Sequence, residues 1–179
     1  DDTPAGDAFE RRLYVCRRTI EKKADAEFAL RDKIFYVCSM SARPIVYKGM
    51  LVATQMRRFF IDLNDAAVKT AVALVHSRYS TNTTPSWERA HPNRFIIHNG
   101  EINTLKGNVN WIRAREPNLY SPVLQHDLER VMPIINREGS DSAILDNVLE
   151  FMVMNGRPLT RAASMLLPEP WDNNDSLSE

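Results

Sequence analysis

Apolar and polar positions recur along the chain with two different periods, which predict helices in some segments and strands in others. Helical spacing begins at Asp7, which is placed to cap the helix, and a charged patch at residues 21–33 is expected to end it. The apolar stripe expected on this first helix consists of Phe9, Leu13, Cys16 and Ile20. Further helices are predicted at residues 54–60, 105–117 and 140–155, the last with Gly156 at its C′ position.

Short runs of β-branched, aromatic and other apolar residues between these helices predict strands. Residues 34–38 and 44–47 flank Ser41-Ala42-Arg43, and this arrangement predicts an antiparallel hairpin. Residues 71–75 and 95–97 are continuous apolar runs, as is typical of strands buried on both faces. Because a tight turn joins the first two strands, the pattern favours layered α and β elements over a doubly wound parallel sheet.

Length, composition and charge indicate one globular domain and exclude several function classes. The chain has 179 residues, of which 44% are apolar and 26% charged. Its 23 basic residues equal its 23 acidic ones, which argues against a nucleic-acid partner. No run approaches the length of about 18 apolar residues that a membrane span needs, and the first residues do not resemble a signal peptide. We therefore expect no membrane association.

The cysteines and histidines indicate neither a disulfide nor a metal site. Cys16 and Cys38 are the only cysteines, so free thiols in a reducing compartment, the cytoplasm, are expected. Both occupy positions typical of inert packing residues, on a helix stripe and in an alternating strand. The histidines lack the tight spacing of a zinc site; they are His76, His91, His98 and His126.

Polar clusters follow two of the apolar runs, at places where active sites are commonly built. In the first, residues 76–83, Arg78 is either the bidentate partner of a carboxylate or a surface residue of a Ser/Thr-rich loop. In the second, residues 98–101, Asn99 and Gly100 form either a type I′ turn or a pair of donors to one oxyanion, the side-chain amide and the backbone N–H. Residue chemistry alone leaves both alternatives open.

A third polar cluster, Gly139-Ser140-Asp141-Ser142, stands at the start of the predicted helix 140–155. Ser140 or Asp141 can satisfy the exposed N–H groups there, and an acid complements the helix dipole. The alternative is that Asp141 pairs with the ammonium group of a ligand. Capping alone would explain the cluster.

Taken together, these clusters resemble a known family, the glutaminase domain of glutamate synthase, which is a class II glutamine amidotransferase with an N-terminal nucleophile. The resemblance covers roughly residues 8–170. It is carried by residues 76–83, by His98-Asn99-Gly100-Glu101-Ile102-Asn103-Thr104 with Lys106-Gly107-Asn108 and Asn110-Trp111, and by Gly139-Ser140-Asp141-Ser142. Residues 35–39, 45–50 and 145–148 extend it.

The resemblance implies a fold, a substrate and roles for individual residues. The fold would be a four-layer α/β/β/α sandwich with antiparallel sheets, and the substrate L-glutamine. Arg78 would hold the α-carboxylate of glutamine and Asp141 its α-ammonium group, with Thr81 lining the same pocket. Asn99 and Gly100 would stabilise the tetrahedral oxyanion. The residues that flank this pair, His98 and Glu101, would have packing or positioning roles.

The sequence departs from the family pattern at the nucleophile. The family uses the amino-terminal cysteine, whose own α-amino group is the base, whereas this chain starts with Asp1. Neither Cys16 nor Cys38 has a free α-amino group. We therefore expect residues 1–171 to be a partial domain, incomplete at its N-terminal end and inactive alone, and residues 172–179 to be a disordered polar tail.

For the whole enzyme the resemblance implies conversion of glutamine and 2-oxoglutarate to two glutamates, with FMN and an iron–sulfur cluster outside this segment. The implied partners are the remaining synthase domains and a reductase subunit, and a plant protein would lie in a plastid. Two alternatives stay open. One is a non-catalytic glutamine-sensing module, which the missing cysteine favours and the oxyanion motif opposes. The other is a different class II amidotransferase, which the continuation at residues 101–104 disfavours.

Overall fold

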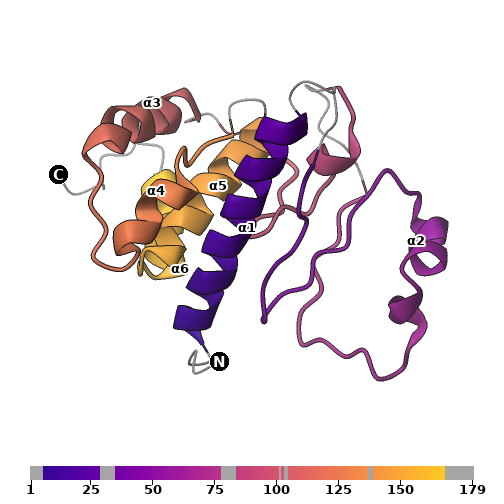
Figure 1. The fold of residues 1–179 in the computed structure, drawn as a ribbon. Helices are drawn as coiled ribbons and strands as arrows, with labels where there is room; N and C mark the ends of the chain where they lie inside the picture. The colour runs from indigo at the N-terminus through magenta and orange to yellow at the C-terminus, as the bar shows by residue number, and fades with distance from the viewer. Residues whose placement is uncertain are drawn as a thin grey trace, which may run out of the picture.

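A computed structural model of the protein describes residues 6–28, 35–77, 84–100, 102, 105–136 and 139–167. The regular elements of this part of the chain are helices (Figure 1). The α-helices are α1 (Asp7–Phe28), α2 (Ala53–Phe59), α3 (Leu105–Arg115), α4 (Leu128–Val131), α5 (Asp141–Met154) and α6 (Leu159–Leu166). The short 3₁₀ helices are η2 (Ile61–Asn64), η3 (Trp87–Arg89), η4 (Glu116–Asn118) and η5 (Gln125–Asp127).

Most of the predicted helices are confirmed. The expected helices at residues 54–60, 105–117 and 140–155 correspond to α2, to α3 with η4, and to α5. The first helix begins at Asp7 as predicted but continues through the charged patch to Phe28, and α6 had no counterpart among the predictions. None of the helices among the described residues is long and apolar enough to cross a lipid bilayer.

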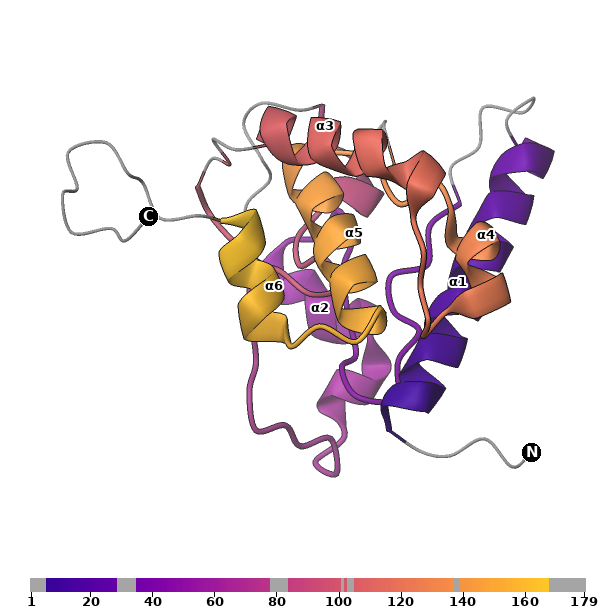
Figure 2. The same cartoon turned by 90° about the vertical axis from the view of Figure 1, so that its left-hand side faces the viewer.

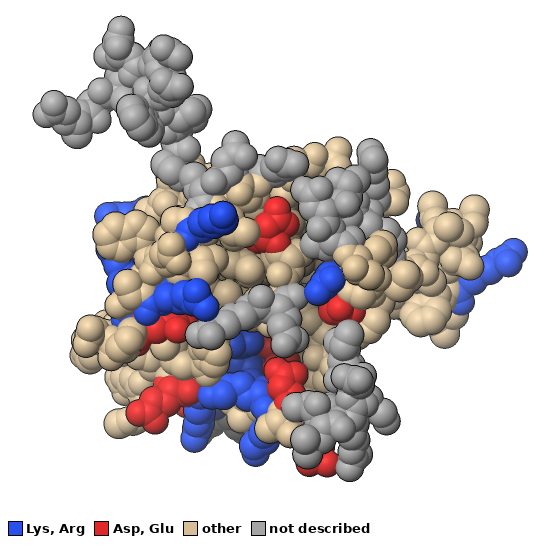
Figure 3. Space-filling view, turned by 90° about the horizontal axis from the view of Figure 1, so that it is seen from above, with Lys and Arg blue, Asp and Glu red and all other residues tan. Residues whose placement is uncertain are grey.

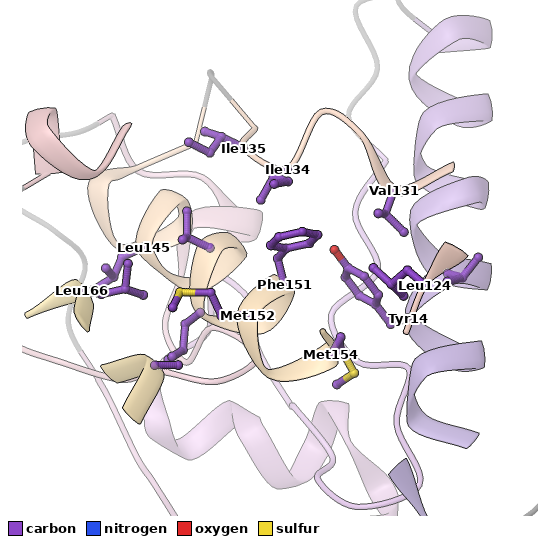
Figure 4. Close-up of a cluster of buried hydrophobic side chains, with 14 residues drawn as sticks. Tyr14, Leu124, Val131, Ile134, Ile135, Leu145, Phe151, Met152, Met154 and Leu166 are labelled. Carbon is purple, nitrogen blue, oxygen red and sulfur yellow. The ribbon is translucent and has the colours of Figure 1, made fainter. Parts of the chain in front are cut away.

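Helix α5 is the centre of the core. It packs against α6, α3 and α1, and Figure 2 shows it between α6 and α1 beneath α3. In Figure 4, Tyr14 of α1 lies on one side of α5 and Leu166 of α6 on the other. Burying each large apolar side chain here stabilises the fold by about 1.5–3 kcal/mol. The α5 residues in this cluster are Leu145, Val148, Leu149, Phe151, Met152 and Met154.

The ends of α5 form as the sequence predicts. The Ser140 hydroxyl accepts a hydrogen bond from the Ala143 N–H at 3.2 Å, so Ser140 is the N-cap. At the other end Gly156 has a φ of +90°, the left-handed conformation that a C′ residue needs and that glycine adopts without strain.

Helix α1 buries a polar stripe instead of the apolar stripe predicted for it. Its buried residues at helical spacing are Glu10, Tyr14, Arg17 and Glu21, whereas Cys16 is exposed and Ile20 is 38% exposed. The prediction for this face was wrong because periodicity ranks side chains by hydropathy and takes no account of ion-pair partners elsewhere in the chain. A buried charge is tolerated when it is paired and hydrogen-bonded.

The partners of Arg17 and Glu21 in the α1 stripe include Glu150 of α5 and Arg94, while Glu10 accepts from the Ser41 hydroxyl and the Ala42 N–H. Arg17 donates to Glu21 at 2.7 Å and to Glu150 of α5 at 2.5 Å, and Arg94 donates to Glu21 at 2.7 Å. Burial opposes the charged form of Glu21, yet the surrounding Arg17, Arg94 and Arg18 lower its pKa. This network fixes α1 and residue 94 against α5, because removing one member would leave a charge buried without its partner.

The expected strands are absent from the described residues, so the predicted four-layer α/β/β/α sandwich with antiparallel sheets is wrong for this structure. The described parts of the runs at 34–38, 44–47, 71–75 and 95–97 form no ladder with one another. Val72 and Val75, expected to be buried on both faces, are 71% and 84% exposed. The reason is that a strand needs a second backbone at hydrogen-bonding distance, and a local sequence pattern cannot specify that neighbour.

Residues 94–96 find their backbone partner on a helix. The Asp146 carboxylate of α5 accepts the N–H groups of Arg94, Phe95 and Ile96 at 3.1, 2.7 and 2.9 Å. Asp146 is 1% exposed, so these three hydrogen bonds form away from water. The segment that leads to residues 98–100 is therefore held on α5 by one side chain.

Charges of both signs share the surface. On the face in Figure 3, the visible Lys and Arg side chains lie among Asp and Glu side chains, and no broad single-sign region stands out. This mixture agrees with the formal net charge of zero.

Replacing Asp146 tests this anchor. Asp146→Ala leaves three backbone N–H groups without their acceptor, so we expect the free energy of unfolding to fall by more than about 3 kcal/mol. Asp146→Asn keeps one acceptor oxygen and should cost less, about 1–2 kcal/mol. Urea unfolding of the 179-residue chain at pH 7 measures both. Equal losses for the two variants would contradict the assigned hydrogen bonds.

The same residue predicts a pH dependence. Burial, followed by the charge of Glu150, raises the pKa of Asp146 from 3.8 to about 6, although N–H groups of Phe95 and Arg94 oppose the rise. Between pH 7 and pH 5 the folded state therefore takes up a proton that the unfolded state does not. This contribution to stability grows by about 1 kcal/mol as pH falls from 7 to 5 and is lost as pH rises through 6.

The variant Asp146→Asn serves as the reference in this measurement, because it lacks the titrating group. The difference in unfolding free energy between the original chain and this variant should shift in favour of the original chain at pH 5. A difference that stays constant across the range would show that Asp146 does not titrate there.

Candidate functional site

Two of the polar clusters meet at the start of α5. The His98 Nε2 lies 2.8 Å from the Ser142 Oγ, although the two residues are 44 positions apart in the chain. Two constraints bring them together: Asp146 fixes residues 94–96, and Ser140 caps the helix that begins at Asp141. The site is thus built on the first turns of the most buried helix in the described structure.

Asp141 uses one carboxylate oxygen within its own helix turn. Its Oδ1 accepts hydrogen bonds from the Ser142 N–H at 2.7 Å and from the Ser142 hydroxyl at 3.2 Å. Because the Ser140 hydroxyl caps the helix, the Asp141 carboxylate is not needed as the N-cap. The Asp141 side chain is only partly buried. A carboxylate held in this way at an accessible helix start is chemically suited to bind an ammonium group.

Asn99 and Gly100 are exposed and do not form the type I′ turn considered above. That turn requires a positive φ at both central residues, and neither residue has one. The Gly100 N–H donates to the His98 Nδ1 at 3.3 Å. A Cβ added at Gly100 would meet no atom within 4 Å, so the backbone there is open to an approaching ligand.

A row of three histidine rings in contact joins the first polar cluster to this site. The ring centroids of His76 and His91 are 4.8 Å apart, and those of His91 and His98 are 5.4 Å apart. Burial, together with His76, His98 and Lys48, lowers the pKa of His91 to about 4, so this ring is neutral at pH 7. His76 opens the cluster at residues 76–83, and the histidine row, through the contact of His98 with Ser142, therefore connects all three sequence clusters.

Beside the histidine row, two cationic side chains contact one aromatic ring. The Lys48 Nζ is 4.6 Å from the Tyr36 ring centroid, and the Arg94 guanidinium carbon is 4.5 Å from the same centroid. The Lys48 Nζ is buried with no hydrogen-bond partner in the described part of the chain. Burial is the main reason why the pKa of Lys48 falls to about 8. The Tyr36 ring, through its electron-rich faces, takes the place of a hydrogen-bond acceptor for Lys48, whereas Arg94 also donates to Glu21 and to the Val37 carbonyl.

The two cysteines lack the environment of an activated nucleophile. Cys16 is exposed on α1 and has no contact with residues 98–100 or 140–142 among the interactions described above. Burial raises the pKa of the Cys38 thiol, although Lys48 and Arg94 oppose the rise. A reactive cysteine has a lowered thiol pKa, so Cys38 fits a packing role.

The structure places some predicted site residues and leaves others undescribed. It brings His98, which precedes Asn99 and Gly100 in the chain, to the first turn of the helix that begins at Asp141. Arg78, Thr81 and Glu101 lie outside the described residues. Among the residues that are described, no group of three or more His, Cys, Asp or Glu side chains has the arrangement of a metal site.

Several residues that shape the site were not predicted from the sequence. Asp146 could have been found, because it is an acid next to the apolar stripe residues Leu145 and Val148 and a buried acid needs a partner. The pairing of His98 with Ser142 left no signal of this kind, since it depends on how distant segments pack.

Comparison with known proteins identifies the family. The model of the family "Glutamine amidotransferases class-II" matches residues 1–179. The glutamate synthase [NADPH] large chain of Bacillus subtilis is 52% identical over 172 residues, which are 96% of this chain and 11% of that protein.

Two eukaryotic relatives give the same result. Glutamate synthase [NADH] of Schizosaccharomyces pombe is 47% identical over 97% of this chain and 8% of its own length. The chloroplastic ferredoxin-dependent glutamate synthase of rice, Oryza sativa, is 43% identical over 96% of this chain and 10% of its own length. The chain thus spans about a tenth of the length of these curated relatives, and it belongs to the class II glutamine amidotransferases.

Proposed function

We propose that this chain is the glutamine-binding part of the glutaminase domain of a glutamate synthase, in which hydrolysis of L-glutamine supplies ammonia. The observation that carries the proposal is the contact between His98 and Ser142, which brings the Asn99-Gly100 pair to the start of α5 beside Asp141. The relatives named glutamate synthases, matched over nearly all of this chain, support the same assignment.

The proposed pocket binds the two ends of the amino acid and its reacting amide separately. Asp141 pairs with the α-ammonium group, and Arg78 makes a bidentate contact with the α-carboxylate. Thr81, three residues beyond Arg78, lines the same pocket. One opposite charge for each end of a zwitterion fixes the position of the side-chain amide.

The reacting end of glutamine lies at the Asn99-Gly100 pair. When a nucleophile adds to the side-chain amide, its carbonyl oxygen becomes an oxyanion. In the proposed mechanism the Asn99 side-chain amide and the Gly100 N–H donate to this oxyanion, and the Gly100 N–H turns to it from the His98 Nδ1, its acceptor in the structure. Such donors matter more in the transition state than in the ground state, because the negative charge is then largest.

This chain supplies the pocket and the oxyanion donors, and the nucleophile is not one of its two cysteines. Cys16 lies on an exposed face of α1, and the raised thiol pKa of Cys38 is opposite to that of an activated thiolate. Without an activated thiolate beside the pocket, bound glutamine is not cleaved by the chain alone.

The cofactors proposed for the whole enzyme are not held by these residues. Iron–sulfur clusters commonly need four cysteine thiolates, and this chain has two cysteines. The residues of this chain therefore do not fit the cluster. The overall conversion of glutamine and 2-oxoglutarate to two glutamates, with FMN and a reductase partner, is proposed for a longer polypeptide.

Glutamine binding by the 179-residue chain tests the proposal. Isothermal titration should detect L-glutamine and give at least tenfold weaker binding for Asp141→Asn, which removes the charge facing the ammonium group. Arg78→Lys should also weaken binding, because lysine keeps the charge and loses the planar two-point contact.

The matched control in this experiment is Asp127→Asn, which makes the same change at a partly exposed acid outside the site, paired with Arg130. Ammonia release from glutamine should stay at the blank level throughout. Binding that is equally strong in Asp141→Asn would contradict the ammonium assignment. Hydrolysis abolished by Cys38→Ala or Cys16→Ala would contradict the assignment of the nucleophile.

Asn99→Gly separates a catalytic from a purely binding role in a glutamate synthase polypeptide that contains this sequence. The substitution deletes the side-chain amide, and kcat for glutamine hydrolysis should fall by about 10²–10³ with little change in KM. Circular dichroism melting checks that the variant is folded. A folded variant with normal kcat would favour the glutamine-sensing alternative, which needs the pocket but no oxyanion donor.

A further inference from the structure

The residues around His98 form a directed chain of hydrogen bonds. The Gly100 N–H donates to the His98 Nδ1 at 3.3 Å, so this nitrogen carries a lone pair. In a neutral imidazole the proton is then on Nε2, which lies 2.8 Å from the Ser142 Oγ. The Ser142 hydroxyl accepts from His98 and donates its own hydrogen to the Asp141 Oδ1 at 3.2 Å.

We propose that His98 is a positioning residue that links the Gly100 N–H to Asp141 through Ser142, with its ring neutral and its proton on Nε2. The inference rests on the proposed function, in which Gly100 is an oxyanion donor and Asp141 binds the ammonium group. His98 touches neither the substrate nor the reacting atoms. It sets the distance between the two residues that do.

The surroundings of His98 hold the ring in one orientation. On one side the His91 ring meets it edge-on, with centroids 5.4 Å apart. On the other side Ser142 is 2% exposed, so its hydroxyl is shielded from water and has two partners, His98 and Asp141. A buried hydroxyl between one donor and one acceptor cannot reverse its direction without losing both bonds, and this fixes the tautomer.

The linkage gives His98 a defined effect on catalysis. Gly100 is exposed, and its backbone N–H is oriented by the lone pair of His98 alone among the described contacts. An N–H has one hydrogen, so the Gly100 N–H must turn from the His98 Nδ1 to the oxyanion when the negative charge develops. Without His98 the exposed backbone of Gly100 is no longer held within reach of that position. Since misplacement by about 1 Å can lower a rate by about 10²-fold, losing the linkage should reduce kcat.

The first test is spectroscopic and is independent of glutamine. Nitrogen chemical shifts of ¹⁵N-labelled histidine in the 179-residue chain at pH 7.5 should show His98 as the Nε2–H tautomer, with the resonance assigned by its loss in His98→Gln. Ser142→Ala should move the Nε2 shift. Ser140→Ala is the matched control, because it removes a hydroxyl that caps the same helix without touching His98, and it should leave that shift unchanged.

The second test uses kinetics in a glutamate synthase polypeptide that contains this sequence. His98→Asn places an amide near the position of Nδ1, and His98→Gln places one near Nε2. We expect His98→Gln to lower kcat about tenfold or more with KM within about twofold, and His98→Asn to retain most of kcat. Ser142→Thr, which keeps the hydroxyl, should rescue most of what Ser142→Ala loses.

These outcomes separate the inference from the function on which it rests. An Nδ1–H tautomer, or an Nε2 shift unaffected by Ser142→Ala, overturns the linkage even if the chain binds glutamine. Equal kinetic losses in His98→Asn and His98→Gln overturn it as well. The Nε2–H tautomer in a chain that fails to bind glutamine leaves the linkage standing and overturns the proposed function.

Discussion

The carboxylate of Asp146 is the constraint on which the rest of the site depends. Three consecutive backbone N–H groups, at residues 94–96, share this one buried side chain. Three residues further on, the chain reaches Asn99 and Gly100 above the start of the helix that carries Asp146. The position of residues 98–100 relative to Asp141 therefore depends on a single helix and the segment bound to it, with α1 adding support through Arg17 and Glu150.

This arrangement explains why a chain with exposed apolar runs has a well-defined site. Helix α2 and residues 71–75 contribute no buried residue, and Phe59 is 67% exposed. The core, in contrast, is concentrated around α5, whose neighbours α1, α3 and α6 cover most of its surface. The site lies at the start of α5, where Ser142 and Asp146 are buried, so the exposed residues 99 and 100 adjoin a well-packed support.

Local chemistry made some of these features predictable from the sequence. Ser140, Gly156 and the spacing of apolar residues in α5 specify a helix with both ends, because caps and periodicity act within a few residues. The site motifs were recognisable through Asn99, Gly100 and Asp141. The buried face of α1 and the structure of the apolar runs could not be predicted, because Arg17 and Phe95 have partners more than 50 residues away in the chain.

Anchoring by a helix side chain also changes how the site can open. If residues 94–96 formed a strand of a sheet, their amide protons would become exposed to water when that one strand opened. Here the protons of residues 94–96 are all held by Asp146, and the helix that carries it is buried on most sides. Local unfolding of this segment and of α5 should thus occur as one cooperative unit, so we expect the N–H groups of residues 94–96 to open only together with the core.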